Sequence, residues 1–108
     1  MKTDDVLLVI STFPEVEGAA RIAEQLVTER LVACANILPG VRSIYRWKEV
    51  VEEASETAVI FKTTRSRWVE LQQKLRELHP YEVPEIVALN VAEGFPAYLQ
   101  WVGESCAT

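Results

Sequence analysis

Runs of apolar residues predict four β-strands along the chain. The first and third runs, within residues 6–10 and 56–63, are almost uninterrupted and rich in branched side chains, which is typical of strands in the middle of a sheet. The second run, residues 31–48, changes to strict alternation after Pro39-Gly40, where we expect a bend or bulge. The fourth run covers residues 85–92. A polar stretch between the second and third strands predicts a hairpin turn within residues 48–55.

Three other segments repeat apolar residues at spacings of three and four, the period of an amphipathic helix. The first follows Pro14, a residue that suits the first turn of a helix, and runs from Val16 to Val27. The second begins after Thr64, a favoured N-cap residue type, and ends at His79-Pro80 because proline disfavours helical geometry in the residue before it. A short third helix is predicted near residues 96–102.

The resulting order of elements is β-α-β-β-α-β-α. Two split βαβ units joined by a hairpin predict an α+β fold, a ferredoxin-like sandwich with a short C-terminal helix, as a single domain over residues 1–108. In that fold the first and third strands lie at the centre of the sheet and the second and fourth at its edges. The two most apolar runs fall at the two central positions, so the hydrophobic pattern and the expected topology agree.

Composition narrows the range of functions. Among the 108 residues 49% are hydrophobic and 25% charged, an ordinary globular mixture, and the formal net charge of −5 argues against a nucleic-acid partner. No apolar run approaches the roughly 18–20 residues of a membrane span, so we expect no membrane partner. The two cysteines form no CxxC motif, and the N-terminus lacks a basic region followed by an apolar stretch. We therefore expect a cytoplasmic protein.

Five motifs, in order and at matching spacing, resemble the CutA family of divalent-cation tolerance proteins. The resemblance extends from about Val6 to Val102, and several separate motifs make a chance match improbable. The motifs are Leu31-Val32-Ala33-Cys34-Ala35-Asn36-Ile37, Ser43-Ile44-Tyr45-Arg46-Trp47-Lys48, Lys62-Thr63-Thr64, His79-Pro80-Tyr81-Glu82-Val83-Pro84-Glu85-Ile86 and Tyr98-Leu99-Gln100-Trp101.

This resemblance implies a tight homotrimer in the cytoplasm that contributes to tolerance of divalent metals, chiefly copper. We expect a non-enzymatic protein, because the sequence carries no phosphate-binding glycine loop, no HExxH motif and no nucleophile signature. The trimer of the family is similar in architecture to the PII signalling proteins, which bind small effectors between subunits. The alternative hypothesis is therefore a PII-like sensor of a small anionic ligand.

His79, the only histidine, is the candidate metal ligand, since imidazole suits Cu²⁺ and Zn²⁺. The competing interpretation is a structural histidine at the end of a helix. The resemblance implies a copper site in some bacterial members, made of a cysteine and two adjacent histidines. The matching positions here are Ser11, Leu78 and His79, so two of three ligands are missing. We expect weak or altered binding of Cu²⁺ or another divalent cation and no tightly bound cofactor.

Aromatic residues on the second strand indicate a contact with another subunit. Tyr45 and Trp47 share one face of a strand expected at a sheet edge, where exposed aromatic side chains need a cover. Lys62 ends an otherwise apolar strand, so its side chain either reaches solvent or enters a cleft. We predict one ligand pocket between subunits, in which Lys62 would attract an anion and pair with Glu85. The predicted lining is Trp47, Lys62, Tyr81, Glu85 and Tyr98.

The remaining candidates favour structural interpretations. Cys34 lies in an apolar run and is expected to act as a small buried hydrophobe, although a soft metal ligand is the alternative. Cys106 is expected in a frayed tail. The acidic residues at 52, 53 and 56 suggest a solvated face, with weak binding of a hard cation as the alternative. Glu49 stands where the family usually turns on glycine, so the hairpin tip is expected to differ in shape.

Overall fold

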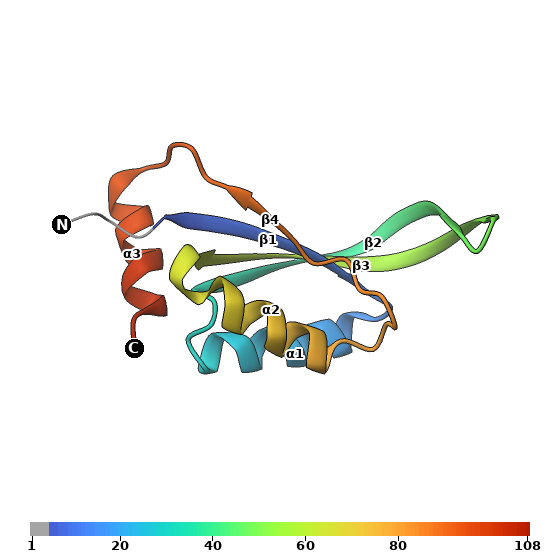
Figure 1. The fold of residues 1–108 in the computed structure, drawn as a ribbon, viewed down its shortest axis with the longest axis horizontal. Helices are drawn as coiled ribbons and strands as arrows, with labels where there is room; N and C mark the ends of the chain where they lie inside the picture. Colours follow the sequence, from blue (N-terminus) through green and yellow to red (C-terminus); the bar gives the residue numbers. More distant parts are fainter. Residues whose placement is uncertain (1–4) are drawn as a thin grey trace.

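The computed structural model describes residues 5–108 and contains one four-stranded antiparallel sheet with three α-helices (Figure 1). The strand order β2-β3-β1-β4 places β1 and β3 at the centre, which confirms the prediction from the two most apolar runs. None of the helices in this part of the chain is long and apolar enough to cross a membrane. The elements are β1 (Val6–Phe13), α1 (Val16–Thr28), β2 (Cys34–Trp47), β3 (Val50–Thr64), a 3-10 turn (Arg65–Arg67), α2 (Trp68–Leu78), β4 (Val87–Asn90) and α3 (Pro96–Cys106).

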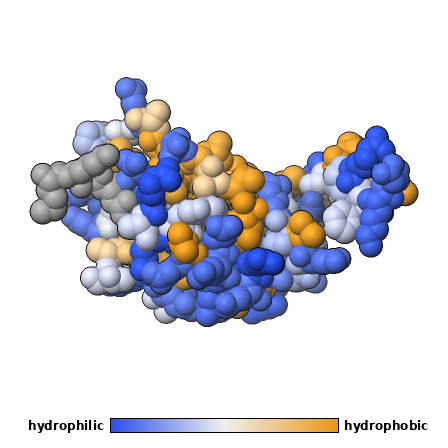
Figure 2. Space-filling view, viewed as in Figure 1, coloured by the Kyte–Doolittle hydropathy of each residue, from blue (hydrophilic) through white to orange (hydrophobic). Residues whose placement is uncertain are grey.

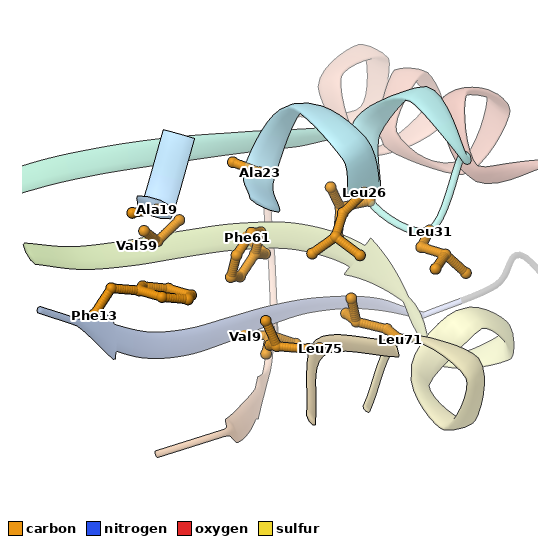
Figure 3. Packing of buried hydrophobic residues seen from close by; sticks show 11 residues of the cluster. Val9, Phe13, Ala19, Ala23, Leu26, Leu31, Val59, Phe61, Leu71 and Leu75 are labelled. Atoms are coloured by element: carbon orange, nitrogen blue, oxygen red, sulfur yellow. The ribbon is translucent and has the colours of Figure 1, made fainter. Parts of the chain in front are cut away.

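The main core lies between one face of the sheet and the pair α1 and α2 (Figure 3). Alternate residues of the central strands, such as Val9 and Phe61, point toward these helices and are fully buried. Leu26 of α1 and Leu75 of α2 complete the same cluster, as the helical spacing of apolar residues predicts. Within residues 5–108, no helix covers the opposite face of the sheet along most of its length.

Helix α3 packs across one end of the sheet and forms a second, smaller cluster. Its Val102 and Cys106 are buried against Val6 and Ala33. The helix continues through Gly103 to Cys106, four residues farther than the sequence predicts. The prediction that Cys106 lies in a frayed tail is therefore wrong, because its side chain is 2% exposed and closes this cluster.

Strands β2 and β3 continue beyond the sheet as a two-stranded ribbon (Figure 1). The pairing of β1 with β3 ends at Phe13 and Thr57. The pairing of β2 with β3 continues farther, to Trp47 and Val50. A register shift between Leu38 and Val41 confirms the predicted bulge, and Gly40 there has a φ of 73°. The ribbon gives the molecule its long axis, with extents of 50 × 26 × 22 Å.

Two predicted boundaries and one predicted capping interaction were wrong. Strand β3 begins at Val50 rather than at residue 56, because the polar residues that follow the turn are still paired across the ribbon. Strand β4 is shorter than predicted and has only four residues. Thr64 occupies the expected position before the 3-10 turn but makes no capping hydrogen bond, and its hydroxyl lies 3.1 Å from the Ser66 hydroxyl instead.

The hairpin turn consists of Lys48 and Glu49, both with positive φ (49° and 71°). A two-residue turn with this geometry normally uses Asn-Gly, because left-handed backbone is strained for residues with a side chain. We predict that Glu49→Gly raises the free energy of unfolding by about 0.5–1 kcal/mol, measured by urea denaturation. Ser55→Gly, in the extended ribbon, is the control and should lower it. A loss of stability in the Glu49 variant would contradict the strain argument.

Candidate functional site

A cleft of about 660 Å³ lies between the ribbon and the connector that joins α2 to β4. The ribbon forms one wall, because residues on β2 and β3 line the cleft. Residues 81–83 and 85 of the connector form the other wall, and Thr12 of β1 lies at the base. Its aromatic residues are Tyr45, Trp47 and Tyr81, and its charged residues are Glu52, Glu56, Glu82 and Glu85. The charged lining is therefore entirely acidic.

His79 attaches the connector to the sheet. Its ring stacks on Phe13 with centroids 4.5 Å apart, and the residue is 7% exposed. The Tyr81 backbone N–H donates to Nδ1 at 3.1 Å, so Nε2 carries the proton and donates to the Thr12 carbonyl at 2.8 Å. Both ring nitrogens are thus used in holding the start of the connector at the end of β1.

Tyr81 connects the two walls of the cleft. Its hydroxyl donates to Oε2 of Glu56 on β3 at 2.6 Å. Burial and, next, the Glu56 carboxylate raise the pKa of Tyr81 well above its ordinary value, so the phenol stays protonated and remains a donor. Desolvation and the charges of Glu52 and Glu56 also raise the pKa of Tyr45. The field within the cleft therefore opposes additional negative charge.

The burial of His79 makes the stability of this region dependent on pH. Burial lowers the pKa of His79, and the Thr12 carbonyl and the Glu56 charge only partly oppose this effect. Because the ordinary pKa is about 6.5, the unfolded chain binds the proton first as the pH falls. The contribution of His79 to stability is therefore complete above about pH 6.5 and decreases as the pH falls toward its lower folded pKa.

We predict that the free energy of unfolding decreases between pH 7.5 and pH 5 and that His79→Phe reduces the steepness of this decrease. Urea denaturation of both proteins across this range measures the difference. Phenylalanine preserves a stacked ring and removes the titrating group. The comparison therefore separates the contribution of His79 to the pH dependence of stability from the contribution of the carboxylates. Parallel pH profiles for the two proteins would contradict the assignment.

The structure separates the five predicted pocket residues into two groups. Trp47, Tyr81 and Glu85 line the cleft, whereas Lys62 and Tyr98 do not. The Lys62 ammonium lies over the Tyr98 ring at 5.7 Å, beside α3. It also donates to Oδ1 of Asn36 at 2.6 Å. Glu56 lies six positions before Lys62 along β3, about 20 Å away in an extended strand.

The geometry at His79 does not fit a metal site. The Nδ1 lone pair accepts a hydrogen bond and Nε2 carries a proton, so a metal ion would have to break one of these contacts. Within residues 5–108 no group of three histidine, cysteine or acidic side chains could hold a metal ion. Ser11 is fully buried, and its hydroxyl has no hydrogen-bond partner. The prediction of weak copper binding at His79 stays a prediction.

Three of the four acidic lining residues were absent from the predicted pocket. The run of charges alone predicts a solvated face for Glu52 and Glu56, with weak binding of a hard cation as the alternative, and Glu82 is not among the predicted pocket residues. The alternation of residues along the two hairpin strands is the sequence signal for these acidic lining residues. Tyr45 lies directly opposite Glu52, so the aromatic and acidic residues share one face of the ribbon. Cys34 is only half-buried, and its Sγ lies 3.8 Å from the Tyr98 hydroxyl, so the expectation of a buried cysteine was only partly correct.

Comparisons with known proteins agree on one family. The profile of the CutA1 divalent ion tolerance protein matches residues 7–105. A divalent-cation tolerance protein CutA from Thermus thermophilus is 49% identical over 98 residues, which cover 91% of this chain and 95% of the relative. The protein of the same description from Thermotoga maritima is 44% identical over 100 residues, covering 93% and 98%.

Solved structures agree with the fold over nearly the whole chain. The crystal structure of CutA from Xylella fastidiosa superimposes with a TM-score of 0.92 at 39% identity and covers 95% of this chain and 99% of its own. The divalent cation tolerance protein of Thermus thermophilus gives a TM-score of 0.91 at 47% identity, covering 94% and 99%.

Proposed function

Because this chain belongs to the CutA1 divalent ion tolerance family, we propose that it is a non-enzymatic protein that contributes to tolerance of divalent metals, chiefly copper. The observation that carries this proposal is the family match over residues 7–105, at up to 49% identity in the relatives described above. The absence of a nucleophile or metalloprotease motif from the sequence supports a role in binding rather than catalysis.

We propose a homotrimer as the working form. The number of subunits comes from the family resemblance, and the surface of this chain supports assembly. Val87 and Leu89 lie opposite Ile10 and Leu8 on the sheet face away from α1 and α2, and each is 47% exposed. Figure 2 shows hydrophobic residues gathered over the middle of the visible face and again on the ribbon, while the α1–α2 side is mostly hydrophilic. Such an apolar surface is typical of a subunit interface.

Calorimetric titration with Cu²⁺ at neutral pH tests direct metal binding. We expect weak binding, because Ser11 and Leu78 supply neither a thiolate nor an imidazole and His79 has both nitrogens engaged. His79→Ala is the diagnostic variant. Tight binding to the wild-type chain that this substitution abolishes would contradict the expectation, and it would mean that histidines of several subunits converge in the trimer.

The alternative, a sensor of a small anionic ligand between subunits, rests on the similarity of the family's trimer to the PII proteins, with Lys62 as the residue that would attract the anion. The cleft has no basic lining residue, and Lys62 contacts Asn36 and Tyr98 elsewhere on the sheet. The charge of the cleft therefore favours a cation over an anion. A thermal-shift screen of anionic metabolites tests the alternative, since a ligand that binds the native state raises the melting temperature.

We propose the cytoplasm as the compartment. The sequence has only two cysteines and no CxxC motif, which is usual for a protein of a reducing compartment. The related structure from Archaeoglobus fulgidus is described as a periplasmic divalent cation tolerance protein, so relatives are also assigned to another compartment. Fractionation of cells that express the tagged chain, with a cytoplasmic enzyme as the marker, distinguishes the two.

A further inference from the structure

We propose that the ribbon, residues 41–56, is a hinged arm whose direction is set by the hydrogen bond from Tyr81 to Glu56. The hinge is the β-bulge at Pro39 and Gly40. This inference goes beyond metal tolerance and concerns how the chain positions the aromatic residues of the ribbon. Only its consequence for assembly rests on the proposed homotrimer.

The ribbon has little support from the rest of the chain. None of the residues 41–56 is buried, so no packed core holds the direction of the ribbon. Strand β1, the third strand at this end of the sheet, stops where Phe13 pairs with Thr57. Beyond this level, among the described residues, the backbone of the ribbon pairs only within itself. A two-stranded segment has no third strand that resists bending out of the sheet.

The bulge in β2 lies at the level where β1 ends. Pro39 and Gly40 stand opposite a single residue of β3, Thr57, between the regular pairs on either side. Proline has no N–H to donate to the ladder, and Gly40 has a φ of 73°, which glycine adopts without strain. A bulge of this kind bends the strand and interrupts its pairing. Because Thr57 is also the last partner of β1, the ribbon can turn at this level.

One side-chain contact restrains the ribbon at the hinge. The Tyr81 hydroxyl donates to Oε2 of Glu56 at 2.6 Å, and Glu56 is the ribbon residue next to the hinge level. Within residues 5–108 this is the only side-chain hydrogen bond or ion pair that joins the ribbon to the rest of the chain, because the contact between Arg42 and Glu53 stays inside the ribbon. A hydrogen bond to a carboxylate is about twice as strong as one between neutral groups.

The donor of this hydrogen bond is itself fixed to the end of β1. The Tyr81 N–H donates to Nδ1 of His79 at 3.1 Å, and the centroids of the two rings are 5.0 Å apart. His79 stacks in turn on Phe13. Phe13 pairs with Thr57, the residue next to Glu56, so these contacts close a ring around the hinge. The Tyr81 hydroxyl therefore has a fixed position from which it orients the ribbon.

Residual dipolar couplings, measured by NMR on the full-length protein, test the hinge. In the wild-type protein the amides of residues 41–56 should fit the same alignment as the central strands, with order parameters of about 0.85. Tyr81→Phe removes only the hydroxyl and should lower the order parameters of the ribbon below about 0.6, while those of the central strands stay unchanged. The decrease should be absent at Leu38 and Ala58, which pair with each other beside β1.

Glu56→Ala removes the acceptor and should give the same result as Tyr81→Phe. The double variant Y81F/E56A should lose no more order than either single variant, because both remove the same hydrogen bond. The matched control is Tyr98→Phe, which removes a phenol hydroxyl that lies beside Cys34 on α3 and should leave the ribbon as it is. Unchanged order in Tyr81→Phe, an equal decrease in Tyr98→Phe or additive losses in the double variant would overturn the proposal.

Light scattering of the same samples reports the oligomeric state separately. A monomeric wild-type protein would contradict the proposed trimer and leave the test of the hinge intact. If the trimer is present, Tyr81→Phe should raise the concentration at which it dissociates about three-fold or more, because fewer ribbons point in the direction in which the interface forms. A trimer whose ribbons keep the wild-type order without the Tyr81 hydroxyl would show that the neighbouring subunits set their direction, which would overturn the proposal.

Discussion

Alanine at both Tyr45 and Trp47 should convert the proposed trimer into monomers at micromolar concentration. Both side chains are 40% exposed in the isolated chain and stand on a ribbon that no third strand flanks. If they are anchors of the subunit interface, each truncation costs about 2 kcal/mol or more of association free energy in each contact. Light scattering across a dilution series measures the shift.

The control for assembly is Val69→Ala, because Val69 is 63% exposed on α2, away from the apolar sheet face. This variant should assemble like the wild-type protein. A wild-type chain that remains monomeric at all concentrations would contradict the trimer itself. If the double variant still assembles, the main subunit interface lies on the sheet face that carries Val87 and Leu89 rather than on the ribbon.

His79→Ala should lower the free energy of unfolding by about 3 kcal/mol. The substitution removes a buried ring stacked on Phe13 and leaves the Thr12 carbonyl and the Tyr81 N–H without their partners. A lost aromatic contact and two broken hydrogen bonds together give a cost of this size. Urea denaturation measures it.

His79→Phe separates the two contributions, since it restores the stacked ring without the hydrogen bonds. We expect it to recover part of the loss. If alanine costs less than about 1 kcal/mol, the connector is held to the sheet by other contacts and the histidine is not its main attachment. The result also concerns the cleft, because His79 holds the start of the connector, and Tyr81 is the first connector residue that lines the cleft.

The elements that follow a strong period were predictable from the sequence. The continuous apolar runs at residues 6–10 and 56–63 predicted the two central strands, and the spacing of three and four predicted α1 and α2. The ribbon was underestimated because residues 50–53 are exposed on both faces, so no buried apolar face distinguishes a strand from a turn. Its turn also lacks the Asn-Gly signal, since Lys48 and Glu49 adopt positive φ instead.

The candidate site was only partly predictable for the same reason. Trp47, Tyr81 and Glu85, which the sequence predicts for one pocket between subunits, line one cleft within the chain, because the edge strand and the connector approach each other. Lys62 lies outside this cleft, because the extended strand β3 carries it about 20 Å from Glu56. The predicted pocket between subunits stays a prediction. The cleft is acidic because strand pairing across the hairpin brings glutamates of β3 beside aromatic residues of β2. The order of charges along the sequence does not reveal this pairing.

The isolated ribbon has a consequence for amide hydrogen exchange. Among the described residues, the backbone of residues 41–56 pairs only across the ribbon, and a two-stranded segment opens easily without a packed face. In a dissociated subunit these amides should exchange much faster than those of Val9 and Phe61, which the core protects until global unfolding. In the proposed trimer the same amides would exchange through subunit dissociation. Their exchange rate should therefore depend on protein concentration, while that of the core amides at the centre of the sheet depends on it far less.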